Sequence, residues 1–335
     1  MEKSNMTIRD VAKKAGVSVA TISRALNNSP LIKQETKEDI LKLIDDLGYT
    51  PNSLGRDLRT AKTKRILVLT PLLVWPILRD VFDGIETAAR QKGYTLIACP
   101  TSSNKKKEWE QLQMLQNRLV DGVIILNSSL SKKELTDLGK THHVVQCCEI
   151  KETDFTVSIS IDEEQAAYDA VKYLLSLGHE KIGMLSSKSV NSARLRLKGY
   201  KKALADHKIS FDEQLIQYGQ LSYEDGVHLT ERLLHIHPRP TALFCISDVL
   251  ATGAAKTLQK AGFKVPEEFS IVGFDNTQEA VMASPELTTI SQPTFAIGTE
   301  AFNTLYHNIH SETKKYPTIK LPHQLIERSS TAPLQ

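Results

Sequence analysis

Between residues 66 and 335, short apolar runs of strand length alternate with longer stretches whose apolar residues recur at helical spacing. The strand-like runs are 66–70, 94–100, 122–127, 144–148, 181–185, 242–247 and 269–275, and the helix-like stretches are 77–92, 106–118, 163–177, 192–206, 224–236 and 249–262. Apolar strands alternating with helices are typical of parallel sheets covered on both faces. The pattern predicts two doubly wound α/β lobes. We expect a ligand cleft between them, because open α/β sheets bind ligands beyond the carboxyl ends of their strands.

Residues 1–49 have only helical patterns. Thr7 followed by Asp10 is a capping-box-like start, and Gly16 is placed to end the first helix. Ser18 can cap a second helix after a short turn, and a third helix is expected over 35–47. Helix, glycine-containing turn and helix is the helix-turn-helix arrangement, so we expect an all-α head; a generic small helical bundle is the alternative.

Charge is unevenly distributed between this head and the body. Residues 1–65 contain 13 Lys and Arg against 8 Asp and Glu, whereas the remaining 270 residues contain 29 against 31. A basic head on a near-neutral body indicates a polyanionic partner. The second helix carries small residues and one arginine, a shape that suits the major groove of DNA.

Several classes of protein are excluded by the same sequence. No apolar run approaches the length of a membrane span, and the first residues lack a secretory apolar region. The four cysteines form no CxxC pair, so we expect reduced thiols, a cytoplasmic protein, no metal and no cofactor. Without a nucleophile elbow or a P-loop, two classes remain. One is a ligand-responsive transcription factor. The other is a two-lobed binding protein or sugar-metabolising enzyme. The head argues against the second class, because neither of its members needs a recognition helix.

The quoted motifs carry a family resemblance. TIRDVAKKAGVSVATISRALNNSP and DDLGYTPNSLGRDL resemble the DNA-binding head of the lactose-repressor (LacI/GalR) family. GHEKIGML, SARLRLKGY, SDVLATGA, VPEEFSIVGFDN and LTTISQP resemble its effector-binding core, which is similar to the periplasmic sugar-binding fold. The sequences of these motifs are most similar to those of the branch that holds the cytidine and purine repressors. The resemblance implies a repressor that binds a palindromic DNA operator as a homodimer. It also implies a small effector: a sugar, a sugar derivative such as a sugar phosphate, or a nucleoside.

The resemblance also implies a division of the chain. The head covers 1–49, a hinge helix and linker cover 50–65, and the effector-binding and dimerisation domain covers 66–335. Within that domain the N-terminal lobe is expected at 66–161 and 293–320, and the C-terminal lobe at 162–290 and 321–331.

Positions that match the family's DNA-binding residues fall in the head and the hinge. The recognition helix would read bases with Val19, Ala20 and Arg24 and would contact phosphates from Thr7, Ser18, Thr21, Ser23 and Asn27. Hydroxyls and amides position a protein on the phosphate backbone, and an arginine can bind a guanine edge with two hydrogen bonds. In the hinge, Leu58 would wedge between base steps, Arg59 would follow it into the minor groove, and Asn52 and Arg56 would hold the backbone.

Positions that match effector-binding residues each have a second interpretation. Arg196 suits a ligand or an inter-helix salt bridge, and Asp275 suits a ligand or a cap for the next turn. Ser247 and Asp248 end a strand, but Asp248 could equally cap the helix over 249–262. Asp162 lies at a lobe crossover, where a hinge role and a ligand role are both open.

The pocket also departs from the cytidine-repressor branch. That branch has a polar residue, a proline and two phenylalanines after the first strand of the body, where this chain has Trp75, Pro76, Ile77 and Leu78. An aromatic stacking position of the second lobe is Leu221 here. Trp75 could supply a replacement ring or could simply fill the cleft. The ligand class therefore does not transfer from the branch, and a pocket that binds nothing remains an alternative.

Overall fold

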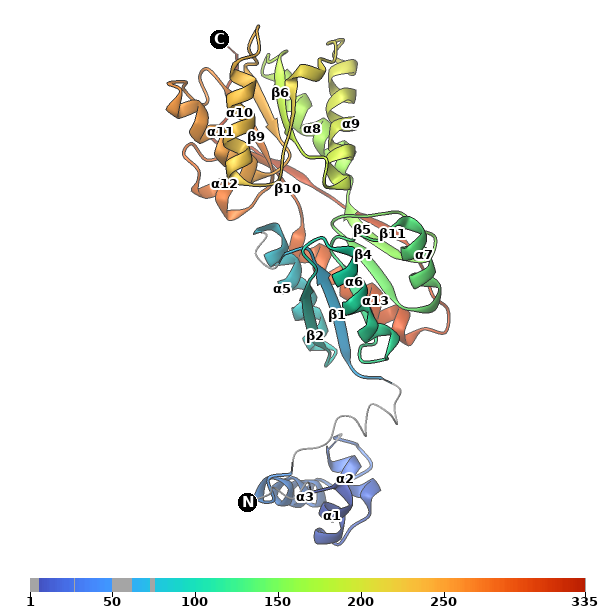
Figure 1. Cartoon of the computed structure of the whole chain (residues 1–335). Helices are drawn as coiled ribbons and strands as arrows, with labels where there is room; N and C mark the ends of the chain where they lie inside the picture. Colours follow the sequence, from blue (N-terminus) through green and yellow to red (C-terminus); the bar gives the residue numbers. More distant parts are fainter. Residues whose placement is uncertain (1–5, 27, 50–61, 73–75, 335) are drawn as a thin grey trace. The chain divides into compact units, whose positions relative to one another are not determined.

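The computed structural model describes residues 6–26, 28–49, 62–72 and 76–334. The chain divides into two compact units, Met1–Lys62 and Thr63–Gln335. The first unit contains the head, and the second contains two α/β lobes (Figure 1).

The head has the three expected helices: α1 (Ile8–Lys14), α2 (Val19–Leu26) and α3 (Gln34–Asp46). Thr7 and Asp10 form the predicted capping box at the start of α1. Gly16 adopts a left-handed φ of 65° directly after the C-cap of α1, a conformation that favours glycine. Six buried apolar side chains hold the helices together: Val11, Ala12, Ile22, Ala25, Ile40 and Ile44.

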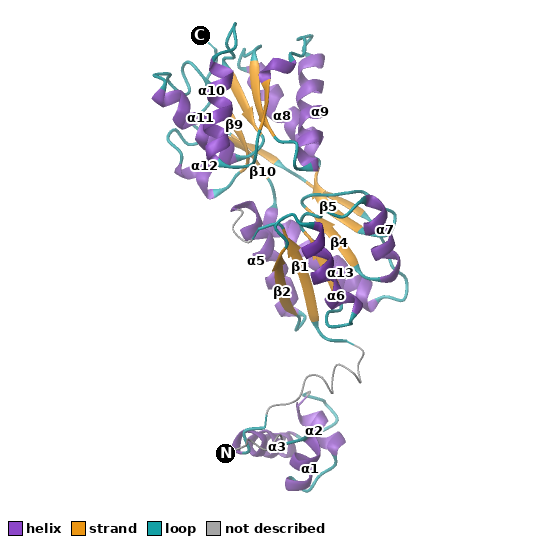
Figure 2. Cartoon of the chain, in the orientation of Figure 1, coloured by secondary structure: helices purple, strands orange, loops and turns teal. Residues whose placement is uncertain are grey.

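The N-terminal lobe is built on a six-stranded parallel sheet in the order β11-β5-β4-β3-β1-β2 (Figure 2). Its strands are β1 (Arg65–Thr70), β2 (Thr95–Pro100), β3 (Gly122–Ile125), β4 (Val144–Cys147), β5 (Val157–Ile161) and β11 (Thr318–Leu321). Its helices are α5 (Pro76–Gln91), α6 (Lys105–Gln116), α7 (Lys132–Thr141) and α13 (Thr294–His310).

Alternation along β1 shows how the helices cover both faces of this sheet. Ile66 and Val68 pack in the cluster that includes α5 and α13, whereas Leu67 and Leu69 pack with α6 and α7. Successive side chains of a strand point to opposite faces, so a strand buried on both sides is apolar throughout. The apolar runs of the sequence therefore mark strands of the two sheets, most of them central, while the run at 94–100 is the edge strand β2.

The C-terminal lobe has a second six-stranded sheet, in the order β12-β10-β9-β8-β6-β7. All neighbouring strands are parallel except β12, which is antiparallel to β10. The strands are β6 (Ile182–Ser186), β7 (Ile216–Tyr218), β8 (Ala242–Cys245), β9 (Ser270–Asp275), β10 (Thr288–Ser291) and β12 (Gln324–Ile326). The helices are α8 (Glu163–Ser176), α9 (Asn191–Asp206), α10 (Tyr223–Leu234), α11 (Asp248–Lys260) and α12 (Gln278–Met282). The predicted fold class, a helical head and two parallel-sheet lobes, is confirmed.

Glycines allow three helix pairs to approach closely. A Cβ added at Gly298 of α13 would overlap the carbonyl oxygen of Val81 in α5, and one at Gly84 would overlap that of Phe295. Gly199 of α9 lies equally close to α8, and Gly226 of α10 lies close to Leu250 of α11. In each of these three helix pairs the backbones of the two helices thus lie in direct contact.

The chain passes between the two sheets three times: between β5 and α8, between β10 and α13, and between β11 and β12. At the first crossing Asp162 is the N-cap of α8, and its carboxylate also forms an ion pair with Lys320 of β11 at 2.7 Å. Burial acts to raise the pKa of Asp162, but the hydrogen bond and charge of Lys320 and the backbone amides of α8 together outweigh it, so that the pKa is lowered. Asp162 therefore joins two of the crossing segments.

The body begins earlier than the sequence suggested, because residues 63–65 are bound to it. The Asp121 carboxylate accepts hydrogen bonds from the Thr63 amide at 2.7 Å, the Thr63 hydroxyl at 2.9 Å and the Lys64 amide at 2.9 Å. Lys64 has a left-handed φ of 55°, and Arg65 is the first residue of β1. Asp121 thus fixes the point at which the linker joins the N-terminal lobe, at the opposite end of β1 from Pro71.

Candidate functional site

The head presents an exposed face on α2. Val19, Ala20 and Arg24 are exposed there, while Ile22 and Ala25 of the same helix are buried in the head core. This separation follows the helical period, which places residues four apart on one face. The three side chains predicted to read bases therefore share a solvent-facing surface.

The predicted phosphate-binding hydroxyls lie at the starts of α1 and α2. The Ser18 hydroxyl accepts from the Thr21 amide at 3.2 Å and lies 2.9 Å from the Thr21 hydroxyl. The Thr7 hydroxyl donates to Asp10 at 2.7 Å, and Ser23 is partly exposed on α2. The amino ends of both helices attract anions. Asn27, Asn52, Arg56, Leu58 and Arg59 lie outside the described residues.

In the body, the carboxyl ends of six strands from both sheets meet at one cavity. Its wall includes residues that end or directly follow these strands: Pro71, Leu126, Cys148, Ile246, Asp275 and Gln292. The described residues enclose about 70 Å³, well below the ~300–1,000 Å³ of pockets that hold small-molecule ligands. A larger hollow of about 660 Å³ adjoins it and shares Pro76, Asp275 and Gln292 with it, so the space at the strand ends extends beyond the enclosed part.

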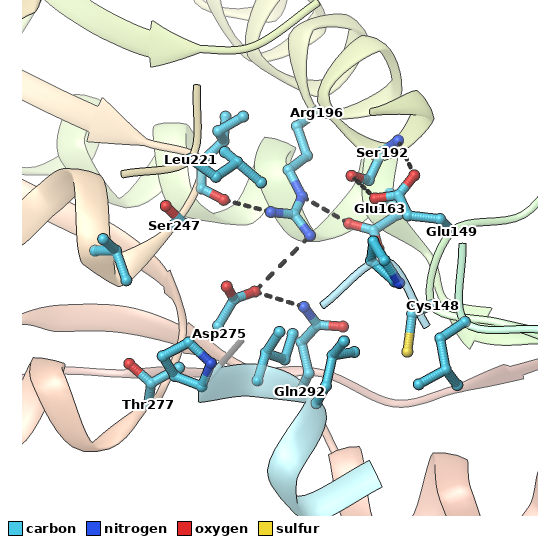
Figure 3. A pocket seen from close by; sticks show the side chains of 17 residues that line it. Cys148, Glu149, Glu163, Ser192, Arg196, Leu221, Ser247, Asp275, Thr277 and Gln292 are labelled. Carbon is cyan, nitrogen blue, oxygen red and sulfur yellow. Dashed lines mark hydrogen bonds and ion pairs between the residues drawn. The ribbon is translucent and has the colours of Figure 1, made fainter. Parts of the chain in front are cut away.

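Arg196 of α9 occupies the centre of this cavity (Figure 3). Its Nε donates to Glu163 at 2.8 Å, one terminal nitrogen donates to the Ile246 carbonyl, and the other lies 3.9 Å from Asp275. The guanidinium carbon is 3.5 Å from the centre of the Phe274 ring, a cation–π distance. Arg196 thus forms the inter-helix salt bridge, between α9 and α8, and it also faces the cavity, while its ligand role stays a prediction.

The charges around Arg196 shift one another. Burial acts to lower the pKa of Arg196, but Glu163 and Asp275 outweigh it and raise the pKa. Burial raises the pKa of Glu163 and holds that of Asp275 well above its usual range, although Arg196 opposes both shifts. Asp275 also accepts from the Gln292 amide at 2.7 Å and has a left-handed φ of 108°. Non-glycine residues in such conformations are strained and cluster at functional sites.

Glu149, after β4 in the N-terminal lobe, bonds to α9 of the other lobe. Its carboxylate accepts from the Ser192 amide at 3.1 Å and from the Ser192 hydroxyl. The N-cap of α9 is Val190, which has no side-chain hydrogen bond to offer. The Asn191 side chain also donates to the Ile150 carbonyl at 2.8 Å. The start of α9 is therefore capped from across the cleft.

The other predicted effector residues differ in their relation to the cavity. Ser247 and Leu221 line the cavity, and Ser247 is also the N-cap of α11. Asp162 is not among the residues that line it. Trp75 lies outside the described residues, although its neighbours Pro76, Ile77 and Leu78 line the cavity.

Asp248 does not line the cavity either, and it is not the cap of α11. It is completely buried as the first residue of that helix. Its carboxylate accepts from the Thr289 hydroxyl at 2.6 Å and the Thr277 amide at 2.7 Å. Burial raises its pKa to about 7. The expectation of a cap is wrong because Ser247, one residue earlier, has the extended backbone of an N-cap and takes that place.

Several cavity residues were not foreseen, among them four that can form hydrogen bonds: Glu149, Glu163, Ser192 and Gln292. Glu149 and Gln292 follow strands, so the rule that ligands bind beyond carboxyl ends could have found them. Glu163 and Ser192 lie in the first turns of helices. The packing of α8 against α9 brings Glu163 to Arg196, and the approach of the two lobes brings Ser192 to Glu149.

Metal sites and membrane-spanning helices would indicate other kinds of function. Within the described residues, no group of three or more His, Cys, Asp or Glu side chains is placed to hold a metal ion. No helix in that part of the chain is long and apolar enough to cross a membrane.

Two known family models match separate parts of the chain. A model of bacterial regulatory proteins of the lacI family matches residues 7–52. A model of the periplasmic binding protein-like domain matches residues 171–331.

Relatives match over almost the whole chain. The chain is 35% identical to catabolite control protein A of Priestia megaterium over 331 residues, which is 98% of this chain and 99% of the relative. It is 33% identical to the HTH-type transcriptional repressor PurR of Vibrio atlanticus (strain LGP32), over 98% of this chain and 99% of the relative. A purine repressor is thus a relative, as the sequence indicated, but catabolite control protein A is just as similar.

Solved structures agree with the fold. The lac repressor dimer bound to operator and the anti-inducer ONPF matches 98% of this chain and 100% of its own, with a TM-score of 0.88 and 27% identity. A LacI family transcriptional regulator from Enterococcus faecium with bound ribose matches 81% of this chain and 100% of its own, with a TM-score of 0.74 and 31% identity.

Proposed function

Because the chain belongs to the LacI family of bacterial regulatory proteins, we propose that it represses transcription as a homodimer on a palindromic operator. A small ligand in the cleft between its lobes controls this binding. The observation that carries the proposal is the exposed face of α2, where Val19, Ala20 and Arg24 stand clear of the head core. A surface of small side chains with one arginine can approach base edges closely.

The palindrome and the dimer follow from the small size of one recognition helix. A single helix reads only a few base pairs, and a twofold dimer reads two matching half-sites. Exposed apolar side chains on α10 and α12 of the C-terminal lobe support self-association: Tyr223 is 39% exposed, Val281 50% and Met282 74%. Apolar side chains gathered on a surface are typical of a protein–protein interface.

The cleft supplies the control. A ligand that prefers one angle between the lobes shifts the population of that angle by its difference in affinity for the two states. The linker joins the N-terminal lobe at Thr63, where Asp121 holds it, so a change of lobe angle in a dimer alters the separation of the two linkers. DNA affinity then depends on the ligand, which is a sugar, a sugar derivative or a nucleoside.

A two-lobed enzyme or transport protein is the competing class. Such a protein has no use for a basic helix-turn-helix head, and the relatives described above are regulators. We therefore place the protein in the cytoplasm, where it reaches DNA, and assign it no catalytic residue and no cofactor.

Binding of the full-length protein to palindromic duplexes selected from a random pool tests the proposal. Fluorescence anisotropy should show a preference over random DNA and an affinity that falls steeply with salt. Arg24→Ala should weaken binding to the selected duplex by about 5- to 150-fold, because one good arginine–base contact contributes about 1–3 kcal/mol of discrimination.

Lys42→Ala is the matched control, since it removes one exposed positive charge from α3 and leaves α2 intact. It should lower affinity for selected and random DNA alike, or leave both unchanged. The proposal fails if no duplex is preferred to random DNA at any salt concentration, with or without candidate ligands.

A further inference from the structure

Acidic side chains dominate the charge of the cleft. Among the described residues that line the cavity, four are charged: Glu149, Glu163 and Asp275 are carboxylates, and Arg196 is the one cation. A ligand in this space would meet three potential negative charges against one positive charge. Uncompensated charges of this kind act strongly in a poorly solvated site.

The single cation is already committed to the protein. Arg196 donates to Glu163 at 2.8 Å and to the Ile246 carbonyl, and it lies 3.9 Å from Asp275. One of its flat faces covers Phe274. An anionic ligand group would have to displace these carboxylates from the guanidinium and leave them buried without a partner, which is costly.

The start of α9 is the second feature that could bind an anion, and it is also occupied. A helix N-terminus carries roughly half a positive charge and free amide groups. Here the Ser192 amide and hydroxyl both donate to Glu149, whose carboxylate stands where a ligand phosphate would bind. The chain thus places its own acid at each of the two anion-attracting points.

Neither neighbouring groups nor protonation reverses this balance. The start of α5, at Pro76, contributes at most about half a positive charge. Lys151, two residues after Glu149, is bound to the Ser128 and Leu130 carbonyls. In the hollow that adjoins the cavity, Arg79 is accompanied by two further acids, Asp80 and Glu279. With Asp275 protonated, as its burial favours, two carboxylates still face one guanidinium.

On the basis of the proposed effector function, we propose that this cleft takes a polyhydroxylated ligand without an anionic group, either an uncharged sugar or an amino sugar. It excludes phosphorylated and carboxylated sugars. The carboxylates of Glu149, Glu163 and Asp275 accept hydrogen bonds from ligand hydroxyls or an ammonium group, and Ser247 can accept or donate. The charge of the cavity thereby removes sugar phosphates from the class of possible effectors.

Matched ligand pairs test this inference on the full-length protein. Calorimetric titration would compare glucose, glucosamine and glucose 6-phosphate, cellobiose and cellobiose 6-phosphate, and ribose and ribose 5-phosphate. At least one uncharged or amine-bearing member should bind, and its phosphorylated partner should bind at least tenfold more weakly. A phosphorylated member that binds as tightly as its parent overturns the inference, and so does a panel in which nothing binds.

A charge variant tests the same inference by changing the protein instead of the ligand. Glu149→Gln removes one negative charge from the cavity and should narrow the gap between each sugar and its phosphate by about tenfold. Glu180→Gln is the control, because Glu180 is exposed just before the start of β6, at the opposite end of that strand from the cleft. An unchanged gap in Glu149→Gln, or an equal change in Glu180→Gln, overturns the inference.

Failure of the inference is distinguishable from failure of the proposed function. Selected-duplex binding measured on the same preparation reports the regulator function whatever the ligand charge. If a sugar phosphate both binds and alters operator affinity, the regulator stands and the charge rule falls. If no palindrome is preferred to random DNA, the proposed function itself falls.

Discussion

Asp248→Asn should stabilise the body, and more so at high pH. Asp248 is fully buried, and burial raises its pKa from 3.8 to about 7. A group whose pKa is raised by folding contributes stability that is complete below the unfolded-state pKa and is lost as pH rises through the folded-state pKa. For Asp248 this loss runs from about pH 4 to just above pH 7.

The size of the effect follows from that shift. Each pKa unit corresponds to about 1.4 kcal/mol, so the ionised side chain costs the folded body about 4 kcal/mol at pH 8. Asparagine keeps the size of aspartate without the charge. Its carbonyl oxygen can accept from the Thr277 amide and its amide can donate to the Thr289 hydroxyl, in the two positions that the carboxylate occupies. The advantage of Asn over Asp should therefore grow by about 3 kcal/mol between pH 5 and pH 8.

Thermal unfolding of the two proteins at pH 5 and pH 8 measures this difference. For a domain as large as the body, about 3 kcal/mol corresponds to a widening of roughly 6 °C in the Tm gap. Asp154→Asn is the matched control, because Asp154 is exposed and the same substitution there should produce no widening. A gap that is equal at both pH values, or that shrinks at pH 8, would refute the reasoning. It would mean that the Thr277 amide and Thr289 hydroxyl hold the carboxylate in its ionised form.

Three further substitutions test the packing, the cleft and the linker attachment. Gly298→Ala should lower the free energy of unfolding by about 1–3 kcal/mol, because the added methyl overlaps the Val81 carbonyl; an unchanged Tm would contradict the close packing of α5 on α13. Arg196→Ala should cost about 3–5 kcal/mol in urea unfolding, because it leaves two buried carboxyl groups unpaired, and a stability equal to wild type would show that the pair is not coupled. Asp121→Ala should speed hydrogen exchange at the Thr63 amide and cost about 1–3 kcal/mol, whereas unchanged exchange would mean that other contacts fix the linker.

The Arg196 prediction changes how a loss-of-response variant is interpreted. Because Arg196 holds Glu163 and Asp275 inside the body, its removal would abolish a ligand response even without any contact to the ligand. Stability therefore has to be measured beside ligand binding. Ser247→Ala disturbs no buried ion pair and is the cleaner probe of a ligand contact.

Local sequence patterns were sufficient for the head and for the frame of the body. The capping box of Thr7 and Asp10 and the turn at Gly16 depend on residues a few positions apart, and both were predicted. The apolar central strands were found for the same reason. Strand β5 was missed because Ser158 and Ser160 interrupt its apolar run, although both are buried. Their burial is a property of the finished sheet.

The cleft was only partly predictable. The sequence by itself determined that Asp275 and Ser247 would lie at strand ends and Arg196 on a helix, because helical and strand periods are set locally. The place of Arg196 at the cleft was implied only by the family resemblance. Only the tertiary structure decided that Arg196 meets Glu163, that Glu149 caps a helix of the other lobe, and that Asp248 is sealed beneath Thr277 and Thr289. Those partners lie about 30 to 45 residues apart in the chain. Their contacts depend on how two sheets and the helices between them pack, and no pattern within one element encodes that packing.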